Sequence, residues 1–365
     1  MKPLYALALP LYGAAAGVWV LAVGLLLTAQ TAPGRLMGLS WVLLVPALYL
    51  LSIAPAVRRA LVWRSAGALL SVATLAGLAA AALAPNGETN SSRFLSVWTE
   101  GYPRYALATV VPEQDQFTLG SYLATVDPYM DRPKTARLRG LFQTIYGEAG
   151  SDPAFVAAGS SMPFAYRELF GLPGDSHHLY ALLPEGDGPH PTAVFLHGSM
   201  GNFKGYQWVL KDLSDACDIA IVSPDFGAGF WGDPQGLEVI DRTLAWIDAH
   251  PALESGPMPL MGLSNGGLGV TRAALQRPQD WTQLVYINGV LEPGRADELA
   301  DLPLPVLVLD AGLDARIPFH VTDEAVSRLD QVTQRTWPDE DHFLFFSKPD
   351  EVVAAIADSL CPNPP

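Results

Sequence analysis

The sequence predicts an α/β fold with a mostly parallel sheet, preceded by three transmembrane helices. Two observations lead to this prediction. From His177 onward, short apolar stretches typical of buried strands alternate with stretches that carry apolar residues at helical spacing. Before residue 93, three successive stretches rich in Leu, Ala and Val contain no charged residue. About 20 apolar residues are enough to cross the hydrocarbon core of a membrane.

The three uncharged stretches predict spans at about residues 4–28, 36–56 and 65–84. A cleaved signal peptide would explain only the first of them, which is long for that role. Basic residues concentrate on the cytoplasmic side of membrane helices. The connection between the second and third spans is therefore expected in the cytoplasm, because it contains Arg58, Arg59 and Arg64. This orientation puts Arg35 on the outer side, which is the one basic residue that does not fit the rule. The chain after the third span is then extracytoplasmic.

Charge divides the chain unevenly. Residues 1–93 hold six of the 22 basic residues and one of the 37 acidic residues, so the remainder is strongly acidic. A polyanion would be repelled by such a surface, which argues against nucleic acid as a partner. We expect three parts: a membrane region at 1–93, a linker or lid at 94–174, and the α/β domain at 175–365. Residues 94–170 are also open to interpretation as a spacer or as the first strands of the sheet.

The pattern becomes regular after His177. The predicted strands are His178–Leu183, Thr192–Leu196, Ile219–Ser223, Pro257–Met261, Leu284–Val290, Pro305–Leu309 and Val332–Trp337. The predicted helices are Tyr206–Cys217, Pro234–His250, Gly266–Leu275 and Pro349–Leu360. Earlier in the chain, Thr135–Tyr146 is expected to be helical, and Asp152-Pro153 is expected to start another helix.

The most informative motif is Gly262-Leu263-Ser264-Asn265-Gly266, which reads G-x-S-x-G between a predicted strand and a predicted helix. Small flanking residues let the backbone turn tightly and expose the serine hydroxyl. Upstream, a strand runs into His197-Gly198-Ser199-Met200-Gly201-Asn202. Downstream come Asp310-Ala311-Gly312-Leu313-Asp314 and Asp341-His342. In the order of these motifs, the chain resembles the α/β-hydrolase family over about residues 175–360. Many members of that family insert a cap domain between the two strands that residues 291–304 separate here, and this segment is too short for a large one.

The resemblance implies a catalytic triad of Ser264, Asp314 and His342. Ser264 would be the nucleophile, His342 its base, and Asp314 the acid that orients the imidazole. Family members often have glycine before this histidine, whereas this chain has Asp341. Asp310, at the end of its predicted strand, is the second candidate for the acid, and Glu292 is the third.

The same resemblance implies an oxyanion hole. One donor would be the backbone N–H of Asn265, and the other would come from Ser199 or Met200. His197 is expected to be structural. Phe230 and Trp231 follow a predicted strand, where α/β sheets bind ligands, and are expected to contact substrate or to pack beneath a lid.

The chain has two cysteines, Cys217 and Cys361. Neither has a second cysteine or a histidine at metal-ligand spacing, so the sequence predicts no metal site and no cofactor. Each is either an isolated buried thiol or half of a disulfide. The resemblance adds the second alternative to the first, because the helices that these residues end would lie on the same face of the sheet, and both alternatives stay open.

These observations predict a membrane-anchored serine hydrolase that acts on a small-molecule or lipid ester, a thioester or an amide through an acyl-enzyme. A carboxylesterase or lipase is the first expectation, because an open site beside a bilayer suits apolar esters. A serine peptidase of the same fold is the alternative within the enzymes. A catalytically silent membrane receptor or scaffold is the alternative outside them.

Overall fold

The computed structural model describes residues 2–57, 59–85, 87, 93–99, 101, 107–162, 165 and 175–361. Arg58, on which part of the predicted orientation depends, lies outside the described residues. The chain forms two compact units, which are described separately. The helical unit comprises Met1–Asn86 and Pro103–Gln143, and the sheet unit comprises Gly87–Tyr102 and Thr144–Pro365.

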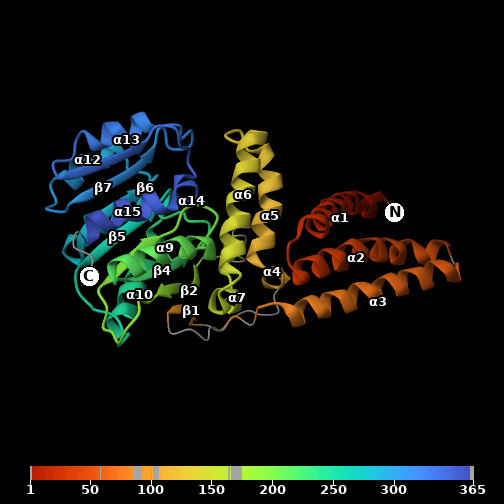
Figure 1. The fold of residues 1–365 in the computed structure, drawn as a ribbon. Coiled ribbons are helices and arrows are strands. Elements are labelled where there is room, and N and C mark those ends of the chain that lie inside the picture. Colours follow the sequence, from red (N-terminus) through yellow and green to blue (C-terminus); the bar gives the residue numbers. More distant parts are fainter. Residues whose placement is uncertain are drawn as a thin grey trace. The chain divides into compact units, whose positions relative to one another are not determined.

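The helical unit begins with three long helices: α1 (Lys2–Thr28), α2 (Ala32–Val57) and α3 (Ala60–Leu83) (Figure 1). Within them, Ala32–Ile53 and Ala60–Leu83 are long and apolar enough to cross a membrane. The described apolar part of α1, Gly13–Thr28, is shorter. Two of the three predicted spans therefore meet this criterion of length and composition, and the first span stays a prediction.

The packing of α3 has the pattern of a lipid-facing helix. Its buried residues are all alanines, namely Ala66, Ala73, Ala76 and Ala80. Large side chains on the same helix are exposed, among them Leu61, Leu75, Leu78 and Leu83. Small residues let helices approach closely in lipid, where outward leucines are favourable. At this interface Ser40 Oγ of α2 donates to the Ala73 carbonyl at 2.8 Å.

Two shorter helices, α4 (Leu107–Val110) and α5 (Glu113–Leu123), contact the ends of these long helices. Asp115 of α5 is fully buried and accepts hydrogen bonds from the backbone N–H groups of Gln30 and Thr31, and from the Thr31 hydroxyl. Val110 belongs to one buried cluster with residues from the end of α1, the start of α2 and the end of α3: Leu25, Ala29, Met37, Ala80 and Ala84. The α1–α2 loop and the end of α3 therefore lie at the same end of the helical unit.

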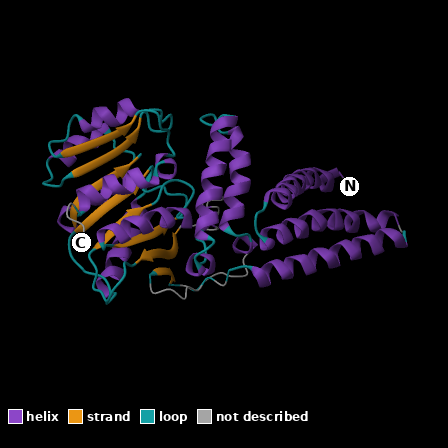
Figure 2. Cartoon of the chain, viewed as in Figure 1, coloured by secondary structure: helices purple, strands orange, loops and turns teal. Residues whose placement is uncertain are grey.

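The sheet unit contains eight strands in the order β1-β2-β4-β3-β5-β6-β7-β8. Figure 2 draws the strands in orange, with helices packed against them. The strands β1 and β2, and β2 and β4, pair antiparallel, and the remaining neighbours pair in parallel. Their bounds are β1 Phe94–Trp98, β2 Asp175–Leu182, β3 Thr192–Leu196, β4 Ala220–Phe226, β5 Met258–Leu263, β6 Trp281–Ile287, β7 Val306–Ala311 and β8 Val332–Trp337. The predicted mostly parallel sheet is confirmed.

Helices cover both faces of this sheet. Phe195 of β3 contacts Tyr206 of α9 (Lys204–Cys217) and Phe345, with ring centroids 5.9 and 6.2 Å apart. Its neighbours Val194 and Leu196 belong instead to the buried cluster that includes α10 (Pro234–Ala249) and α11 (Gly266–Gln276). Because successive strand residues point to opposite faces, α9 lies on one face and α10 and α11 lie on the other. α15 (Pro349–Leu360) packs against α9.

Several predicted elements have the predicted bounds, and others were not predicted. β3, β8 and α15 match the sequence analysis residue for residue, and α6 (Arg132–Ala149) extends the helix predicted at Thr135–Tyr146. Asp152 caps α7 (Pro153–Ala157) by accepting from the Ala154 N–H at 2.8 Å, as its sequence indicates. The alternative that residues 94–170 supply the first strands of the sheet is correct for β1, which pairs with β2. The elements without a prediction are α4, α5, η1 (Ala124–Val126), η2 (Pro278–Asp280), α12 (Pro293–Ala300), α13 (Phe319–Val326) and α14 (Leu344–Ser347).

A disulfide joins the ends of α9 and α15. Cys217 and Cys361 are bonded, with their Cα atoms 5.6 Å apart and a sequence separation of 144 residues. The disulfide alternative of the sequence analysis is therefore the one that the structure adopts. The bridge connects α15, the last helix, to α9, the helix that follows β3.

We expect this bridge to form in the purified protein and to stabilise it. Cross-linking a loop of this length contributes about 5 kcal/mol at most in the loop-entropy model. Alkylation without reduction, followed by mass spectrometry, should find neither thiol modified, and Cys217→Ser should lower the unfolding temperature. Two alkylated thiols in the unreduced protein would contradict the bridge.

Candidate active site

Ser264 lies on a strained turn between β5 and α11. Its φ is +52°, in the left-handed region that few residues other than glycine adopt. The flanking glycines are needed because the backbone passes very close to its surroundings. A Cβ on Gly262 would lie 2.6 Å from the backbone of Gly266, and a Cβ on Gly266 would lie 2.2 Å from the Leu196 carbonyl oxygen. The motif therefore has the strand–turn–helix setting that exposes a nucleophile.

The structure brings the three predicted triad residues together. His342 Nε2 lies 3.1 Å from Ser264 Oγ, and His342 Nδ1 lies 2.7 Å from Asp314 Oδ2. Ser264 follows β5, Asp314 follows β7, and His342 follows β8. These strands run in parallel, so their carboxyl ends meet at one edge of the sheet. Asp341, which replaces the usual glycine, accepts a hydrogen bond from the Phe343 N–H at 3.0 Å and stabilises this turn.

The Asp314 carboxylate is 2% exposed and accepts four hydrogen bonds. Oδ2 accepts from His342 and from Asn288 Nδ2, and Oδ1 accepts from the N–H groups of Arg316 and Ile317 at 2.8 and 2.9 Å. Burial raises the pKa of this carboxyl, but the bonds from His342 and Asn288 outweigh burial and lower the pKa below its usual 3.8. Asp314 is therefore ionised at neutral pH and is protonated only as the pH falls through this lowered value.

Sequence reasoning missed Asn288, which donates to Asp314 Oδ2 at 2.9 Å and is itself buried. It was placed inside a predicted strand at Leu284–Val290, whereas β6 ends at Ile287. Asn288 has a φ of +40°. The signal was available, because Asn288-Gly289 is a dipeptide typical of turns.

Asp310 and Glu292 do not take the place of Asp314. Asp310 is buried, and its Oδ2 accepts from Gln334 Nε2 at 2.7 Å. Burial raises the pKa of this carboxyl, which is the opposite direction to Asp314. Glu292 is an exposed residue directly before α12. Among the described residues, only Asp314 forms a carboxylate hydrogen bond with His342.

The loop after β3 lies against the serine turn. A Cβ on Gly198 would lie 3.1 Å from Ser264 Cβ, so this glycine allows the close approach. The Met200 N–H donates to the Ala228 carbonyl at 3.1 Å, which leaves Ser199 as the better candidate for an oxyanion donor. Within the described residues, neither the Ser199 N–H nor the Asn265 N–H donates to a protein acceptor.

His197 is structural, as expected. It is fully buried, and burial lowers its pKa to about 4, so the ring is neutral. Nε2 accepts from the Phe226 N–H at 3.0 Å, and Nδ1 donates to the Gly198 carbonyl at 2.7 Å. These bonds connect the end of β4 to the loop that approaches Ser264.

Trp231 does not have the substrate-contacting position offered for it. Its side chain is 1% exposed, packs in the cluster of α10 and α11, and donates to the His197 carbonyl at 2.8 Å. The neighbouring Phe230 is 52% exposed and keeps a surface for a ligand.

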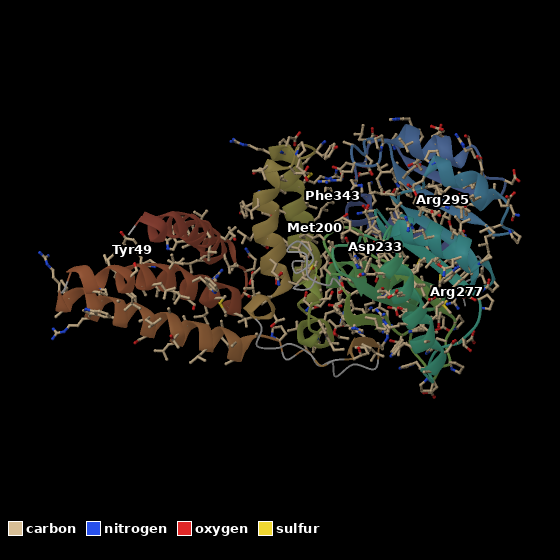
Figure 3. The ribbon with its side chains drawn as sticks, turned by 180° about the vertical axis from the view of Figure 1, so that it is seen from behind. Tyr49, Met200, Asp233, Arg277, Arg295 and Phe343 are labelled. Atoms are coloured by element: carbon tan, nitrogen blue, oxygen red, sulfur yellow. A yellow bond between two sulfur atoms is a disulfide. The ribbon has the colours of Figure 1, made fainter. Side chains whose placement is uncertain are left out.

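An apolar rim consists of Met200, Phe230, Leu313 and Phe343. The first three are at least 51% exposed, and Phe343 is half-buried. They follow β3, β4, β7 and β8, so they lie at the edge of the sheet that carries Ser264. Figure 3 labels Met200 and Phe343 at this edge of the sheet unit. Exposed large apolar residues gathered around a site are typical of a surface that binds apolar groups.

The end of the segment before β2 contacts the loop after β3. Ser161 Oγ donates to the Asn202 carbonyl at 2.7 Å, and a Cβ on Gly201 would lie 3.0 Å from Ala165 and 3.2 Å from Met162.

Within the described part of the chain, no group of three or more His, Cys, Asp or Glu residues could hold a metal ion.

No protein-family model matches the sequence, and no curated protein matches it. Solved structures with similar folds include a CIB-like hydrolase from Thermoplasma acidophilum, at 15% identity over 50% of this chain and 92% of that one, with a TM-score of 0.43. A monoacylglycerol lipase from Paleococcus ferrophilus has 16% identity over 50% and 98% of the two chains, with a TM-score of 0.41. The fluorophosphonate-binding serine hydrolase F of Staphylococcus aureus has 15% identity over 48% and 91%, with a TM-score of 0.41.

These similarities are weak, so the fold is assigned from its own geometry. The sheet is mostly parallel, a strained serine joins β5 to α11, and the acid and histidine follow it in the order Ser, Asp, His. This combination defines an α/β-hydrolase fold.

Proposed function

We propose that the protein is a membrane-anchored serine hydrolase that cleaves an ester, thioester or amide bond through an acyl-enzyme. One observation supports this proposal above all: the His342 imidazole links Ser264 Oγ, at 3.1 Å, to a buried carboxylate of Asp314, at 2.7 Å. A serine hydroxyl is a weak nucleophile, and it becomes effective when a base of this kind removes its proton.

In the proposed mechanism, Ser264 Oγ attacks the substrate carbonyl carbon while His342 Nε2 accepts the hydroxyl proton. The Asp314 carboxylate stabilises the imidazolium through the Nδ1 hydrogen bond. Collapse of the tetrahedral intermediate expels the leaving group, which takes the proton from His342. A water molecule, deprotonated by the same imidazole, then hydrolyses the acyl-serine. The backbone N–H groups of Asn265 and Ser199 bind the oxyanion in both steps.

The apolar rim favours an ester with an apolar acyl or alkyl group. Met200, Phe230 and Leu313 expose side chains that would lose water to such a group. Burying apolar surface stabilises binding by about 25 cal/mol per Å². A carboxylesterase or lipase activity on small-molecule or lipid esters is therefore our first proposal for the substrate class. β1, which belongs to the predicted linker or lid at 94–174, is a strand of the sheet and not part of a lid. For the part of this segment that follows Thr144 in the sheet unit, a lid stays a proposal, supported by the contacts of Ser161 and Met162 with the loop after β3.

A fluorophosphonate probe tests the proposed function directly. It should label the full-length protein once, at Ser264, and labelled protein should no longer hydrolyse p-nitrophenyl esters. A panel of esters with different chain lengths, beside a panel of peptides, would then separate an esterase from a peptidase. A folded protein that is neither labelled nor active would favour a catalytically silent receptor or scaffold.

The proposed membrane anchor places the sheet unit outside the cytoplasm. Exposed leucines on α3, and two helices long enough to span a bilayer, support the anchor. The Cys217–Cys361 disulfide supports an oxidising compartment. The contacts of Asp115 with Gln30 and Thr31 support α2 and α3 as a pair of crossings, because two crossings return the chain after α3 to the side of the α1–α2 loop.

A topology experiment should agree with this placement. In a bacterial host, a periplasm-active reporter fused after Pro365 should be active, and the same reporter inserted between Arg58 and Arg64 should be inactive. The reason is the cluster of basic residues in that connection, set against their absence just after the third span. A cytoplasmic reporter active only at the C-terminus would contradict the placement.

A further inference from the structure

The two residues proposed to supply the oxyanion N–H groups also contact each other through their side chains. Asn265 Nδ2 donates to Ser199 Oγ at 2.7 Å, across 66 residues of sequence. Asn265 directly follows the proposed nucleophile, and Ser199 directly follows Gly198, where an added Cβ would lie 3.1 Å from Ser264 Cβ. The Ser199 hydroxyl is therefore held by the residue next to Ser264, within the loop that would form the proposed oxyanion hole.

The direction of this hydrogen bond determines what the hydroxyl can still do. An amide nitrogen has two hydrogens and no lone pair to offer, so it only donates. Ser199 Oγ is the acceptor, and its own hydrogen is not used in this bond. Among the described residues, no side chain or carbonyl accepts that hydrogen. The serine hydroxyl is therefore held in place with its donor unused.

We propose that the Ser199 hydroxyl is a third donor to the substrate oxyanion, and that the Asn265 side chain is the residue that positions it. This inference rests on the acyl-enzyme mechanism proposed above. As Ser264 Oγ bonds to the carbonyl carbon, the carbonyl electron pair moves onto the oxygen, which the hydroxyl and two backbone N–H groups then bind. Donors aimed at developing charge stabilise the transition state more than the substrate, so their loss lowers kcat rather than raising KM.

Four variants of the full-length protein in detergent, assayed with p-nitrophenyl butyrate, test this proposal. Ser199→Ala removes the hydroxyl and keeps the backbone N–H, and we expect kcat to fall about 10²-fold with little change in KM. Ser199→Thr keeps a hydroxyl and should recover most of that loss. Asn265→Ala should lower kcat by a smaller factor, because the hydroxyl is kept but no longer held.

The double variant, with alanine at both positions, separates positioning from an independent effect. If Asn265 acts through the hydroxyl, the double variant should be no slower than Ser199→Ala alone. The proposal is overturned if Ser199→Ala keeps a wild-type kcat, if Ser199→Thr is as slow as the alanine variant, or if the two single effects multiply.

Active-site titration and thermal unfolding complete the experiment. Ser199 is exposed, so each variant should fold and should reach the same end-point of fluorophosphonate labelling as the wild type. A wild-type protein that is not labelled would contradict the proposed function itself. A labelled and active wild type with an equally fast Ser199→Ala variant would contradict only the third donor.

Discussion

Ser264→Ala should abolish hydrolysis and leave the fold intact. The variant loses the only oxygen that lies within hydrogen-bond reach of His342 Nε2 among the described residues, at 3.1 Å. Removing the nucleophile of a serine protease lowers kcat about 10⁶-fold, and we expect a loss of this order here. Alanine has the same Cβ as serine, so the strained φ of +52° is no less accessible to it. Ester hydrolysis and thermal unfolding of the full-length protein measure the two effects.

The matched control is Ser327→Ala. The Ser327 hydroxyl is exposed at the end of α13 and bonds only to the Glu324 carbonyl among the described residues. This variant should keep wild-type kcat and KM. Full activity in Ser264→Ala would remove Ser264 from the mechanism, and equal losses in both variants would point to a general effect of substitution.

The approach of Ser264, Asp314 and His342 was predictable because β5 and β7 have recognisable apolar patterns and each of the three residues follows a predicted strand. Parallel strands place their carboxyl ends at one edge of a sheet. A serine after β5, an aspartate after β7 and a histidine after β8 are therefore brought together by topology alone. The choice between Asp310, near the end of β7, and Asp314, just after it, needed the hydrogen bonds that each carboxylate accepts.

Features that depend on distant residues could be predicted only in part. β1 is a five-residue strand whose partner β2 begins more than 70 residues later, so the sequence offered a strand there only as one alternative for residues 94–170. The bonds of Asp115 to the α1–α2 loop likewise join residues 84 and 85 apart in sequence. Local patterns report which face of an element is apolar, whereas such pairings depend on the whole chain.

Neighbouring residues also took roles that composition does not separate. Phe230 and Trp231 are both aromatic and both follow β4, but only Trp231 is buried. Ser199 and Met200 are both in the loop after β3, but the Met200 N–H bonds to the Ala228 carbonyl. Met200 has a φ of +82°, a backbone conformation that residues other than glycine rarely adopt and that the sequence gives no reason to expect at a methionine.

Asp314→Asn should lower kcat by about 10⁴-fold, the loss seen when the triad aspartate of a serine protease is replaced by asparagine. The hydrogen bonds at this position explain why. Oδ1 accepts from the Arg316 and Ile317 N–H groups, so the oxygen of an asparagine would stay there. Its NH₂ group would then face His342 Nδ1 and the Asn288 amide, where the carboxylate had accepted two hydrogen bonds. His342 would have to carry its proton on Nε2, and that nitrogen could no longer accept the proton of Ser264.

The matched control for this variant is Asp310→Asn, because it makes the same chemical change on the same strand end. Asp310 bonds to Gln334 and to no part of His342 among the described residues, and burial already raises the pKa of its carboxyl. A neutral amide should therefore be tolerated there, and kcat should stay within about threefold of the wild type, as expected when no group at the reacting centre is changed. Measured kcat values for the two variants decide the assignment of the acid. If Asp310→Asn is the slower of the two, the acid is Asp310, and the hydrogen bond between His342 and Asp314 is not the one that supports catalysis.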